Sequence, residues 1–492
     1  MRLADLLEGR CDDVNQYADA PLAEITGIAC DSRRVEPGFL FAALPGTVAN
    51  GRAFIGDAVE RGAAAVLAPM GAVASADLNI PLIEDANARR SYAVLAARFY
   101  GRQPKTVAAV TGTNGKTSAV IFLRQIWAAL GHRAASAGTL GTQARGGGLV
   151  LDYPGSLTTP DPADLHETLA DLAGHGVDHL AIEASSHGLD QYRLDGVRTG
   201  LAAFTNLSRD HLDYHGDEAT YLAAKRRLFT ELLDADGIAV LNADSAAFDE
   251  LAQACRARGC RVMGFGRAGK DIRLLNTEFL NDGQQVTISV SGRETTIRLP
   301  LIGDFQASNA LCAAGLAIAS GDDAQAVLEA LGTLQGVRGR LEQAGTLPNG
   351  AAIFVDYAHT PDALVTVLRA IRPHVNGQLH VVFGCGGDRD SGKRPEMGRA
   401  AAEHADRVIV TDDNPRSEDP AAIREQAMAG CPQASNIGDR AEAIRIAVEN
   451  LGPGDLLVVA GKGHEQGQTV GDEVRPFDDV SVVQGAIREV TT

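Results

Sequence analysis

A short glycine-rich segment, Thr-Gly-Thr-Asn-Gly-Lys-Thr at residues 111–117, constrains the fold of this chain more than any other feature. It follows the apolar run 106–110 and precedes residues 119–130, whose apolar periodicity predicts a helix. A strand, a glycine turn and the start of a helix together form a phosphate cradle. The glycines let backbone N–H groups approach an anion, and the positive end of the helix dipole attracts it. The segment therefore predicts an α/β domain that binds a phosphorylated ligand.

The end of this segment, Gly115-Lys116-Thr117, favours a nucleotide over a simple anion. Lys116 is placed to reach the terminal phosphates, and the Thr117 hydroxyl is placed to bind Mg²⁺. The usual P-loop has four residues between its glycines, whereas only two residues separate Gly112 from Gly115. This loop is therefore a shortened form of the P-loop. The alternative is a glycine-rich turn that binds nothing, and the position of Gly-Lys-Thr at a strand-to-helix junction argues against it.

Length and charge limit the possible partners. A chain of 492 residues predicts about three domains. The formal net charge of −18 argues against nucleic acid or an anionic membrane surface as the main partner. Acidic residues near the start argue against a signal peptide, and no apolar run approaches a membrane span. Seven scattered cysteines are typical of reduced thiols. We therefore expect a cytoplasmic protein, and a monomer because no coiled-coil pattern is present.

The apolar runs predict three α/β domains, covering residues 1–88, 89–337 and 338–492. The first is small, and the second opens with a helix-like stretch at 86–100 and contains the phosphate loop. Residues 272–303 alternate at period two between turn signals, which predicts antiparallel strands added to the mostly parallel central sheet. The last domain reads as a Rossmann-like open sheet, whose ligands bind beyond the carboxyl ends of its strands. Its predicted strands are 352–356, 380–384, 407–411 and 456–460.

Polar clusters follow the predicted strands of the central domain. Glu183 closes the run 179–184, where a carboxylate beside a phosphate loop is well placed to hold Mg²⁺. The next strand, 201–206, leads into a segment dense in Asp and His that includes His211. Lys225 lies on or beside the apolar stripe of the following helix, and a helical lysine of this kind is usually solvated.

The third domain carries further clusters, at 356–362, 384–394, 412–416 and 461–465. The second of them begins like a dinucleotide fingerprint, but Arg389 replaces its third glycine, which excludes a nicotinamide site. Arg416 offers a planar fork for a carboxylate, and Asp413 and Glu465 are suited to an ammonium group. These side chains predict a site for an amino acid with an extra charged end. Surface ion pairs at loop tips are the alternative for any one of them taken singly.

Taken together, these motifs resemble the Mur ligases, the ATP-dependent amide-forming enzymes of peptidoglycan precursor synthesis. The resemblance covers essentially the whole chain. It rests on the phosphate loop, Glu183–Gly188, Thr205–Gly216, Lys225, Gly303–Asn309 and Arg338–Arg340. Asp31-Ser32-Arg33 with Pro37-Gly38, residues 356–363, and above all Asp413-Asn414-Pro415-Arg416 are similar to the members that add meso-2,6-diaminopimelate.

The resemblance implies a role for each matching residue. ATP binding is implied for Gly112, Thr113, Asn114, Gly115, Lys116, Thr117 and Ser118, with Asn309, Arg340 and Asp356 contributing across the domain boundary. Catalytic roles are implied for Lys116, Glu183, Lys225 and His211. The implied metal ligands are Thr117, Glu183 and Lys225, the last as a carbamate formed with CO₂. Binding of the UDP-linked substrate is implied for Cys30, Ser32, Thr47, Val48, Ala49, Leu157, Thr158, Thr159, Ser185, Gln191 and Arg193. Leu157 departs from relatives that can present a polar side chain there. Diaminopimelate binding is implied for Arg389, Asp413, Asn414, Pro415, Arg416, Gly461 and Glu465.

The implied reaction uses ATP and two Mg²⁺ ions to add meso-diaminopimelate to the D-Glu γ-carboxylate of UDP-N-acetylmuramoyl-L-Ala-D-Glu through an acyl phosphate. Domain closure at hinges near 88 and 337 is expected to accompany it. Two alternatives stay open. One is another ligase of the same superfamily: a lysine-adding enzyme, a D-Ala-D-Ala-adding enzyme or a folylpolyglutamate synthetase. The other is an ATP-binding regulatory module that ligates nothing.

Overall fold

The structure is a computed structural model, and it describes residues 1–8, 23–46, 50–71, 78–155, 157–208, 210, 212–280 and 282–491. The chain divides into two compact units. The first comprises Met1–Ile272 with Cys312–Val327, and the second comprises Arg273–Leu311 with Leu328–Thr492. The boundaries of the three domains expected from the sequence stay a prediction.

The first unit begins with a parallel sheet of four strands in the order β1-β2-β3-β4. The strands are β1 (Gly27–Ala29), β2 (Phe39–Ala42), β3 (Ala65–Pro69) and β4 (Leu82–Asp85), and the helices are α1 (Leu3–Leu7), α2 (Ile55–Glu60) and α3 (Ala88–Tyr100). Helix α3 starts where the side chain of Asn87 accepts a hydrogen bond from the backbone N–H of Arg90. It confirms the helix expected over 86–100.

The larger sheet of the first unit has the strand order β12-β11-β10-β5-β9-β6-β7-β8. Its strands are β5 (Thr106–Thr111), β6 (Ala134–Gly138), β7 (Gly141–Gly146), β8 (Leu149–Tyr153), β9 (His179–Glu183), β10 (Thr199–Phe204), β11 (Leu233–Asn242) and β12 (Arg261–Gly266). Its helices include α4 (Lys116–Ala129), α5 (Pro162–Gly174), α6 (Ser186–Asp190), α7 (Leu212–His215), α8 (Glu218–Arg227) and α9 (Phe248–Ala257). Strand β5 pairs in parallel with both β9 and β10. The carboxyl ends of these three strands therefore meet at one edge, beside the phosphate loop.

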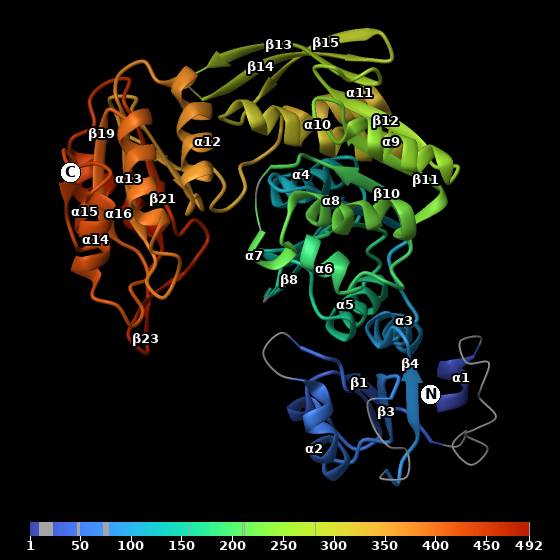
Figure 1. Ribbon diagram of the computed structural model, residues 1–492. Helices are drawn as coiled ribbons and strands as arrows, with labels where there is room; N and C mark the ends of the chain where they lie inside the picture. The colour runs from blue at the N-terminus through green and yellow to red at the C-terminus, as the bar shows by residue number, and fades with distance from the viewer. Residues whose placement is uncertain are drawn as a thin grey trace. The chain divides into compact units, whose positions relative to one another are not determined.

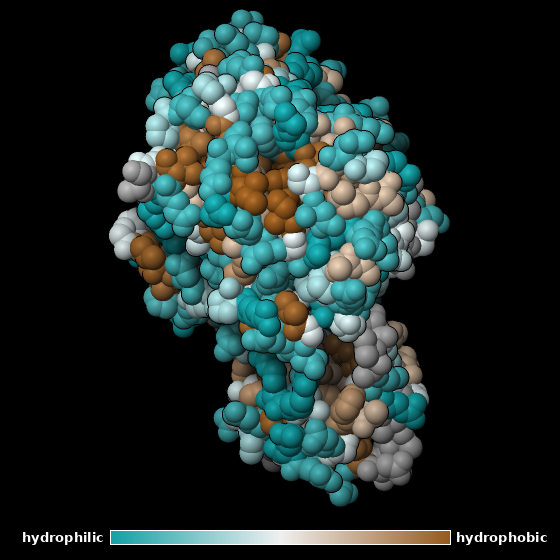
Figure 2. All heavy atoms as spheres, turned by 90° about the vertical axis from the view of Figure 1, so that its left-hand side faces the viewer, coloured by the Kyte–Doolittle hydropathy of each residue, from teal (hydrophilic) through white to brown (hydrophobic). Residues whose placement is uncertain are grey.

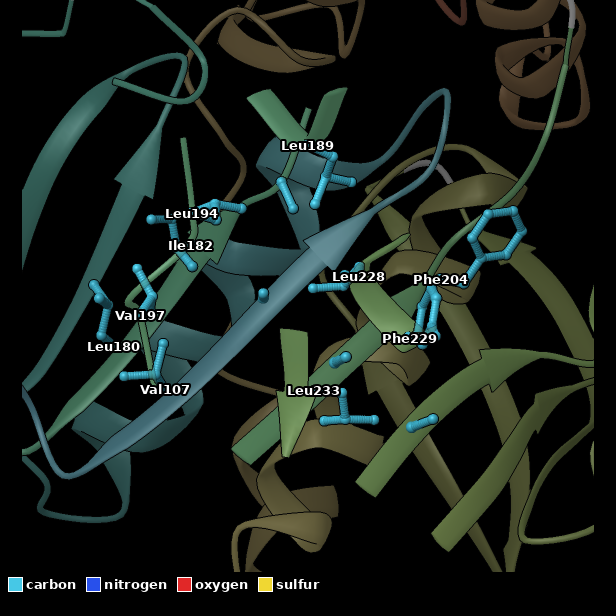
Figure 3. Packing of buried hydrophobic residues seen from close by; sticks show 14 of the residues in the cluster. Val107, Leu180, Ile182, Leu189, Leu194, Val197, Phe204, Leu228, Phe229 and Leu233 are labelled. Atoms are coloured by element: carbon cyan, nitrogen blue, oxygen red, sulfur yellow. The ribbon is translucent and has the colours of Figure 1, made fainter. Parts of the chain in front are cut away.

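A buried apolar cluster lies between this sheet and its helices (Figure 3). Ile182 from β9 and Leu194 lie close to each other in this view, and Phe204 lies beside Phe229 with ring centroids 6.4 Å apart. Leu180 of β9 is fully buried in the same cluster. The alternation of strand-like and helix-like runs thus predicts the parallel core correctly.

The hairpin of β7 and β8 was not expected from the sequence. The two strands pair antiparallel, and β7 also pairs antiparallel with β6. Gly146, Gly147 and Gly148 turn the chain between them, all with positive φ. Only glycine adopts such a succession of left-handed conformations readily, so the glycine run marks the turn.

The second unit contains the antiparallel strands expected over 272–303. They are β13 (Ile272–Leu280), β14 (Gly283–Val290) and β15 (Arg293–Leu299). Ser291 and Gly292 form the two-residue turn between β14 and β15, with φ values of 50° and 83°. Helices α10 (Asp304–Ala319) and α11 (Ala324–Leu331) follow.

The rest of the second unit is an open α/β sheet with the strand order β16-β17-β21-β18-β19-β20. Its strands are β16 (Glu342–Thr346), β17 (Ala352–Asp356), β18 (Leu379–Cys385), β19 (Arg407–Asp412), β20 (Ser435–Asn436) and β21 (Leu456–Ala460), with a separate pair β22 (Gly467–Val470) and β23 (Glu473–Pro476). Its helices are α12 (Pro361–Ile371), α13 (Lys393–His404), α14 (Pro420–Met428), α15 (Arg440–Glu449) and α16 (Asp479–Thr491). One apolar cluster joins the sheet to α12, α13 and α14, and another joins it to α15 and α16, so helices cover both faces (Figure 1). This architecture confirms the Rossmann-like sheet.

Among the residues that the structure describes, few large apolar side chains are exposed. On the face shown in Figure 2, hydrophilic residues surround smaller hydrophobic areas. No helix among the described residues has the length and apolar character needed to cross a membrane. The six cysteines in the described ranges are all free thiols, as expected.

The burial of Leu180 in the core of the first unit leads to a prediction about the free energy of unfolding. Leu180→Ala leaves a cavity between the central sheet and its helices, and we expect it to lower the free energy of unfolding of the first unit by about 2–5 kcal/mol. The chain has a single tryptophan, Trp127 in α4 of this unit, so its fluorescence in a urea titration reports the change. Val150→Ala on β8 is the matched control because that side chain is 66% exposed. Equal shifts in both variants would contradict the assignment of the core.

Candidate active site and substrate cavity

The phosphate loop begins directly after β5. Gly112 has φ of 142°, and a Cβ there would lie 1.9 Å from Oγ1 of Thr205. Gly115 has φ of 84° and stands immediately before α4. Both positions therefore require glycine, the first for space and the second for its left-handed backbone.

The loop is held by residues that follow β10. The Thr205 hydroxyl donates to the carbonyl of Asn114 at 2.6 Å, and the Asn114 N–H donates to Oδ1 of Asn206 at 3.0 Å. The N–H of Thr113 donates to the carbonyl of Asn206, and its Oγ1 accepts from the N–H of Ser208. These bonds fix the loop from the neighbouring strand, which explains part of the polar density that follows β10.

Two lysines converge on this loop. Nζ of Lys116 donates to the carbonyls of Gly112 and Thr113 at 3.0 and 2.8 Å, and Nζ of Lys225 donates to the same Gly112 carbonyl at 2.8 Å. Lys225 is only 1% exposed and lies over the ring of Tyr221, with Nζ 4.2 Å from its centroid. Burial, reinforced by the charge of Lys116, lowers the pKa of Lys225 to about 6. The solvated lysine suggested by the helical pattern is therefore wrong.

Glu183 closes β9 and is buried beside the loop. Its Oε1 accepts the N–H of Thr139 at 2.8 Å, and a Cβ at Gly138 would lie 2.1 Å from that oxygen. Glu183 and Thr117 line the same small cavity, of about 10 Å³. A carboxylate and a hydroxyl at one cavity fit a Mg²⁺ ion, which prefers oxygen ligands and also binds phosphates. His211, the remaining catalytic candidate, lies outside the described residues.

The residues expected to hold the peptide part of a substrate form one hydrogen-bonded group. Oγ1 of Thr159 donates to the carbonyl of Glu183 and lies 2.9 Å from Oγ of Ser185. Arg193 donates to the carbonyl of Thr159 at 2.8 Å. Thr158 lies 3.0 Å from Thr139, hydroxyl to hydroxyl. These contacts connect the group to the carboxyl end of β9.

A cavity of about 690 Å³ lies within the first unit. It brings together five residues predicted to bind the UDP-linked substrate, namely Cys30, Ser32, Leu157, Gln191 and Arg193. The Leu157 side chain is 47% exposed, in keeping with an apolar replacement at a substrate-facing position. Burial, followed by the nearby Asp161, raises the pKa of Cys30 to about 12, so its thiol stays protonated and donates to Asp161 at 3.1 Å. Thr47, Val48 and Ala49 lie outside the described residues.

Sequence reasoning missed several residues of this cavity. Phe54 and Arg89 line it, as do Tyr92 and Asp161, whose side chains hydrogen-bond at 2.6 Å. None of the four belongs to a motif, and Arg89 and Tyr92 sit on the unremarkable helix α3. Only the folded chain brings them to the cavity.

The other predicted nucleotide residues belong to the second unit. Asn309 donates to Oε1 of Gln306 at 3.1 Å, and the Arg340 guanidinium lies over the Tyr357 ring, 4.8 Å from its centroid. Asp356 closes β17 and accepts the N–H groups of Leu341 and Ala358. Burial raises the pKa of Asp356, while Arg340 and these two hydrogen bonds act in the opposite direction.

The predicted amino-acid site of the second unit is assembled at the ends of β18, β19 and β21. Oδ1 of Asn414 accepts Nζ of the fully buried Lys462 at 3.0 Å, and its Nδ2 donates to Glu465 at 2.9 Å. Arg416 has φ of 52° and donates to the carbonyl of Gly387 at 2.7 Å. These contacts order Arg416 beside the loop that follows β18.

The remaining members of this site are also positioned by close packing. Gly461 has φ of 117°, and a Cβ there would lie 2.6 Å from Oδ2 of the buried Asp413. Pro415 is buried, and its carbonyl lies 1.9 Å from a Cβ built at Gly387. Arg389 is exposed on the loop after β18. Lys462 was not among the predicted site residues, although it lies inside a cluster that the sequence singled out.

Comparison with known proteins identifies the class to which this fold and site belong. Three family models match, described as "Mur ligase family, catalytic domain" over residues 24–100, "Mur ligase middle domain" over 110–317 and "Mur ligase, glutamate ligase domain" over 339–463. The chain belongs to the Mur ligase family.

The chain is also similar along its length to individual members of this family. The chain is 52% identical to the UDP-N-acetylmuramoyl-L-alanyl-D-glutamate--2,6-diaminopimelate ligase of Caulobacter vibrioides and 53% identical to that of Bradyrhizobium diazoefficiens, covering 99% of both chains in each case. A solved structure of a ligase of the same name has a TM-score of 0.74 and 33% identity, over 100% of this chain and 99% of the other.

The burial of Lys225 leads to a prediction about how the free energy of unfolding depends on pH. Its pKa of about 6 in the folded state lies below its ordinary 10.5, so between these values the unfolded chain binds a proton that the folded chain does not. This group therefore makes the protein more stable as pH rises through that window. From pH 6.5 to 8.5, in CO₂-free buffer, we expect the free energy of unfolding of the unsubstituted protein to gain about 2–3 kcal/mol relative to Lys225→Met.

Urea unfolding at both pH values measures this difference. Lys105→Met is the matched control, because Lys105 is an exposed lysine of the same unit. The burial argument fails if Lys225→Met and the unsubstituted protein show the same dependence on pH.

Proposed function

We propose that this chain is an ATP-dependent ligase that adds meso-2,6-diaminopimelate to the D-Glu γ-carboxylate of UDP-N-acetylmuramoyl-L-Ala-D-Glu, in cytoplasmic peptidoglycan precursor synthesis. The observation that carries the proposal is the similarity along 99% of both chains to relatives named for this activity. The ordered Asp-Asn-Pro-Arg segment at 413–416 supports the choice of amino acid. We also propose that the protein acts as a monomer.

The phosphate loop is the proposed site of the ATP phosphates. Its N–H groups at the start of α4 suit an anion, and Lys116, whose Nζ now contacts two loop carbonyls, would pair with a phosphate there. We assign Asn309, Arg340 and Asp356 to the same nucleotide on the basis of the family resemblance.

Thr117 and Glu183 are the proposed ligands of Mg²⁺, with Lys225 as a third after carbamylation. When bound, Mg²⁺ offsets the negative charge that develops on the phosphoryl oxygens. Lys225 fits the modification because a buried lysine with a pKa near 6 is largely a neutral amine at pH 7, and only the neutral amine attacks CO₂. The carbamate replaces this neutral amine with an anionic oxygen ligand, and a proton is released. A second Mg²⁺ is part of this proposal.

The cavity of about 690 Å³ is the proposed site of the UDP end of the substrate. Its volume is in the range of pockets that bury small organic ligands. Ser32 and Cys30 lie at one part of the lining, and Gln191 and Arg193 belong to the group that continues through Thr159 to Ser185. This continuity leads from the cavity towards Glu183, as a substrate with a nucleotide at one end and a reacting carboxylate at the other requires.

Diaminopimelate is the proposed ligand of the second unit's site. Arg416 would pair with the distal carboxylate, and Asp413 and Glu465 with the distal ammonium, while Arg389 and Asn414 contact the same end. Lysine lacks that carboxylate and would leave the guanidinium unmatched. Such a loss costs about 3 kcal/mol or more in discrimination.

The proposed reaction proceeds in two steps. An oxygen of the γ-carboxylate forms a bond to the γ-phosphorus of ATP, and the bond from that phosphorus to ADP breaks. The amine of diaminopimelate then forms a bond to the activated carbonyl carbon, phosphate leaves, and the amine releases a proton. Lys116 stabilises negative charge on the phosphoryl oxygens in the first step.

Phosphate release tests the function directly. With ATP, Mg²⁺ and the UDP-linked dipeptide, we expect release that depends on the amino acid and favours meso-diaminopimelate over L-lysine by about 100-fold or more in kcat/KM, the equivalent of roughly 3 kcal/mol. Equal use of lysine would keep a ligase but overturn its specificity. Release that needs neither substrate would favour the regulatory ATP-binding alternative.

Arg416→Ala tests the amino-acid site. We expect kcat/KM for diaminopimelate to fall about 100-fold, because the carboxylate loses a charge-assisted partner, while KM for ATP changes little. Arg475→Ala on β23 is the control, since Arg475 is an exposed arginine of the same unit paired with Glu473. Equal effects on both substrates would remove Arg416 from the site.

Incubation with ¹³C-labelled CO₂ tests the carbamate without an activity assay. We expect one carbamate carbon signal in the NMR spectrum of the unsubstituted protein and its loss in Lys225→Arg, which keeps a cation but stays charged at pH 7. Lys105→Met should retain the signal. A signal that persists in Lys225→Arg would overturn the assignment.

A further inference from the structure

Two histidines and two aspartates gather in the first unit, away from the phosphate loop. His132 follows α4, Asp178 and His179 stand at the start of β9, and Asp322 follows α10. His179 begins the strand that Glu183 ends, so the group lies about 13 Å from the proposed Mg²⁺ site along β9. Neither the family motifs nor the proposed reaction uses these side chains.

We propose that His132, Asp178 and His179 bind a first-row transition-metal ion of the Zn²⁺ or Co²⁺ type. One ligand atom from each residue lies within 4.8 Å of the other two. Two ligands on one tetrahedral Zn²⁺ lie about 3.4 Å apart, so small side-chain rotations close the set. Imidazole nitrogens with a carboxylate favour Zn²⁺, Co²⁺ or Ni²⁺ over Mg²⁺, which takes oxygen ligands.

Hydrogen bonds and a close contact between the rings already orient the two imidazoles. Nε2 of His132 lies 2.7 Å from Oδ1 of Asp322, and Nδ1 of His179 lies 2.8 Å from Oδ1 of Asp178. The two rings are tilted by 37° to each other, with centroids 4.0 Å apart. A carboxylate on the outer nitrogen of a histidine is the arrangement that holds metal-bound imidazoles in place, which is the role we assign to Asp322.

The backbone around the group is well anchored. The N–H of His132 donates to the carbonyl of Trp127 at 2.9 Å, which closes the C-terminus of α4. The N–H groups of Asp178 and His179 both approach the carbonyl of Arg133. Oγ of Ser320 donates to Oδ2 of Asp322. A metal would therefore bind side chains carried on short, ordered connections.

The local electrostatics favour a cation. His132 and Asp322 each lie three residues beyond the end of a helix, α4 and α10, and helix C-termini carry partial negative charge. The two carboxylates add a charge of −2 against two imidazoles that are neutral when they bind metal. Asp178 is about half exposed, and His132 is partly exposed, so an ion can enter from solvent.

The fluorescence of Trp127 reports on metal binding at this site. Trp127 is the single tryptophan, is fully buried, and has its ring centroid 4.9 Å from that of His179. Co²⁺ at the site would quench its fluorescence. In the full chain, treated with chelator and free of nucleotide, we expect saturable quenching that Zn²⁺ reverses and 5 mM Mg²⁺ leaves unchanged, with a visible Co²⁺ absorption band of the same stoichiometry.

Two substitutions locate the ion. His132→Gln and His179→Gln keep an amide that hydrogen-bonds to the neighbouring carboxylate but ligates metal poorly, and each should weaken Co²⁺ binding at least 10-fold. His175→Gln is the control, because His175 is an exposed histidine that pairs with Asp171 on the same unit. Circular dichroism and ATP-dependent ligation confirm that the variants fold.

The proposal is overturned by either of two results. One is the absence of both quenching and the absorption band in the unsubstituted protein at 1 mM Co²⁺, which requires no variant. The other is quenching of undiminished affinity in both His132→Gln and His179→Gln. Neither result bears on the proposed ligase activity, which depends on other residues.

Discussion

The parallel pairing of β5 with both β9 and β10 is the constraint on which the first unit's site depends. Parallel strands end at the same edge of a sheet, so this pairing places the phosphate loop between Glu183 and the Thr205–Asn206 pair. Hydrogen bonds from the residues after β10 then hold the loop in shape. The core packed beneath these strands, including Leu180 and Phe204, keeps the three ends in register. A shift of one strand would separate the phosphate loop from Glu183 and from the residues that hold it.

The two lysines at the Gly112 carbonyl show how burial creates reactivity. Lys116 belongs to the loop and remains partly accessible, whereas Lys225 is buried over the ring of Tyr221 and beside the first lysine. Desolvation and like charge both favour a neutral amine. The same side chain in a solvated helix would stay an ammonium, which cannot undergo the carbamylation that we propose for Lys225. Position in the fold, rather than residue type, makes Lys225 chemically distinct.

In the second unit, the buried ammonium group of Lys462 orders the amide of Asn414 and the carboxylate of Glu465. Lys462 holds Asn414 and Glu465 together at 3.0 and 3.2 Å, and Asn414 also accepts the N–H of Thr469. The segment that contains Arg416 is thereby attached to the end of β21. A site that discriminates between charged ligands has to keep its own charged groups ordered before the ligand arrives. The contacts of Lys462 would meet that requirement in the amino-acid site that we propose.

The local patterns determined much of this protein without a structure. Gly-Lys-Thr at the end of an apolar run predicted the glycine loop between β5 and α4, period-two alternation predicted β13 to β15, and the polar clusters were correctly expected to follow the strand ends. These features are local, because backbone conformation and strand ends depend on neighbouring residues. The burial of Lys225, the inclusion of Arg89 and Asp161 in the cavity of the first unit, the β7–β8 hairpin and the contact of His132 with His179 were decided only by tertiary structure. Each depends on contacts between residues far apart in the chain, and no local pattern encodes which distant segments pack together.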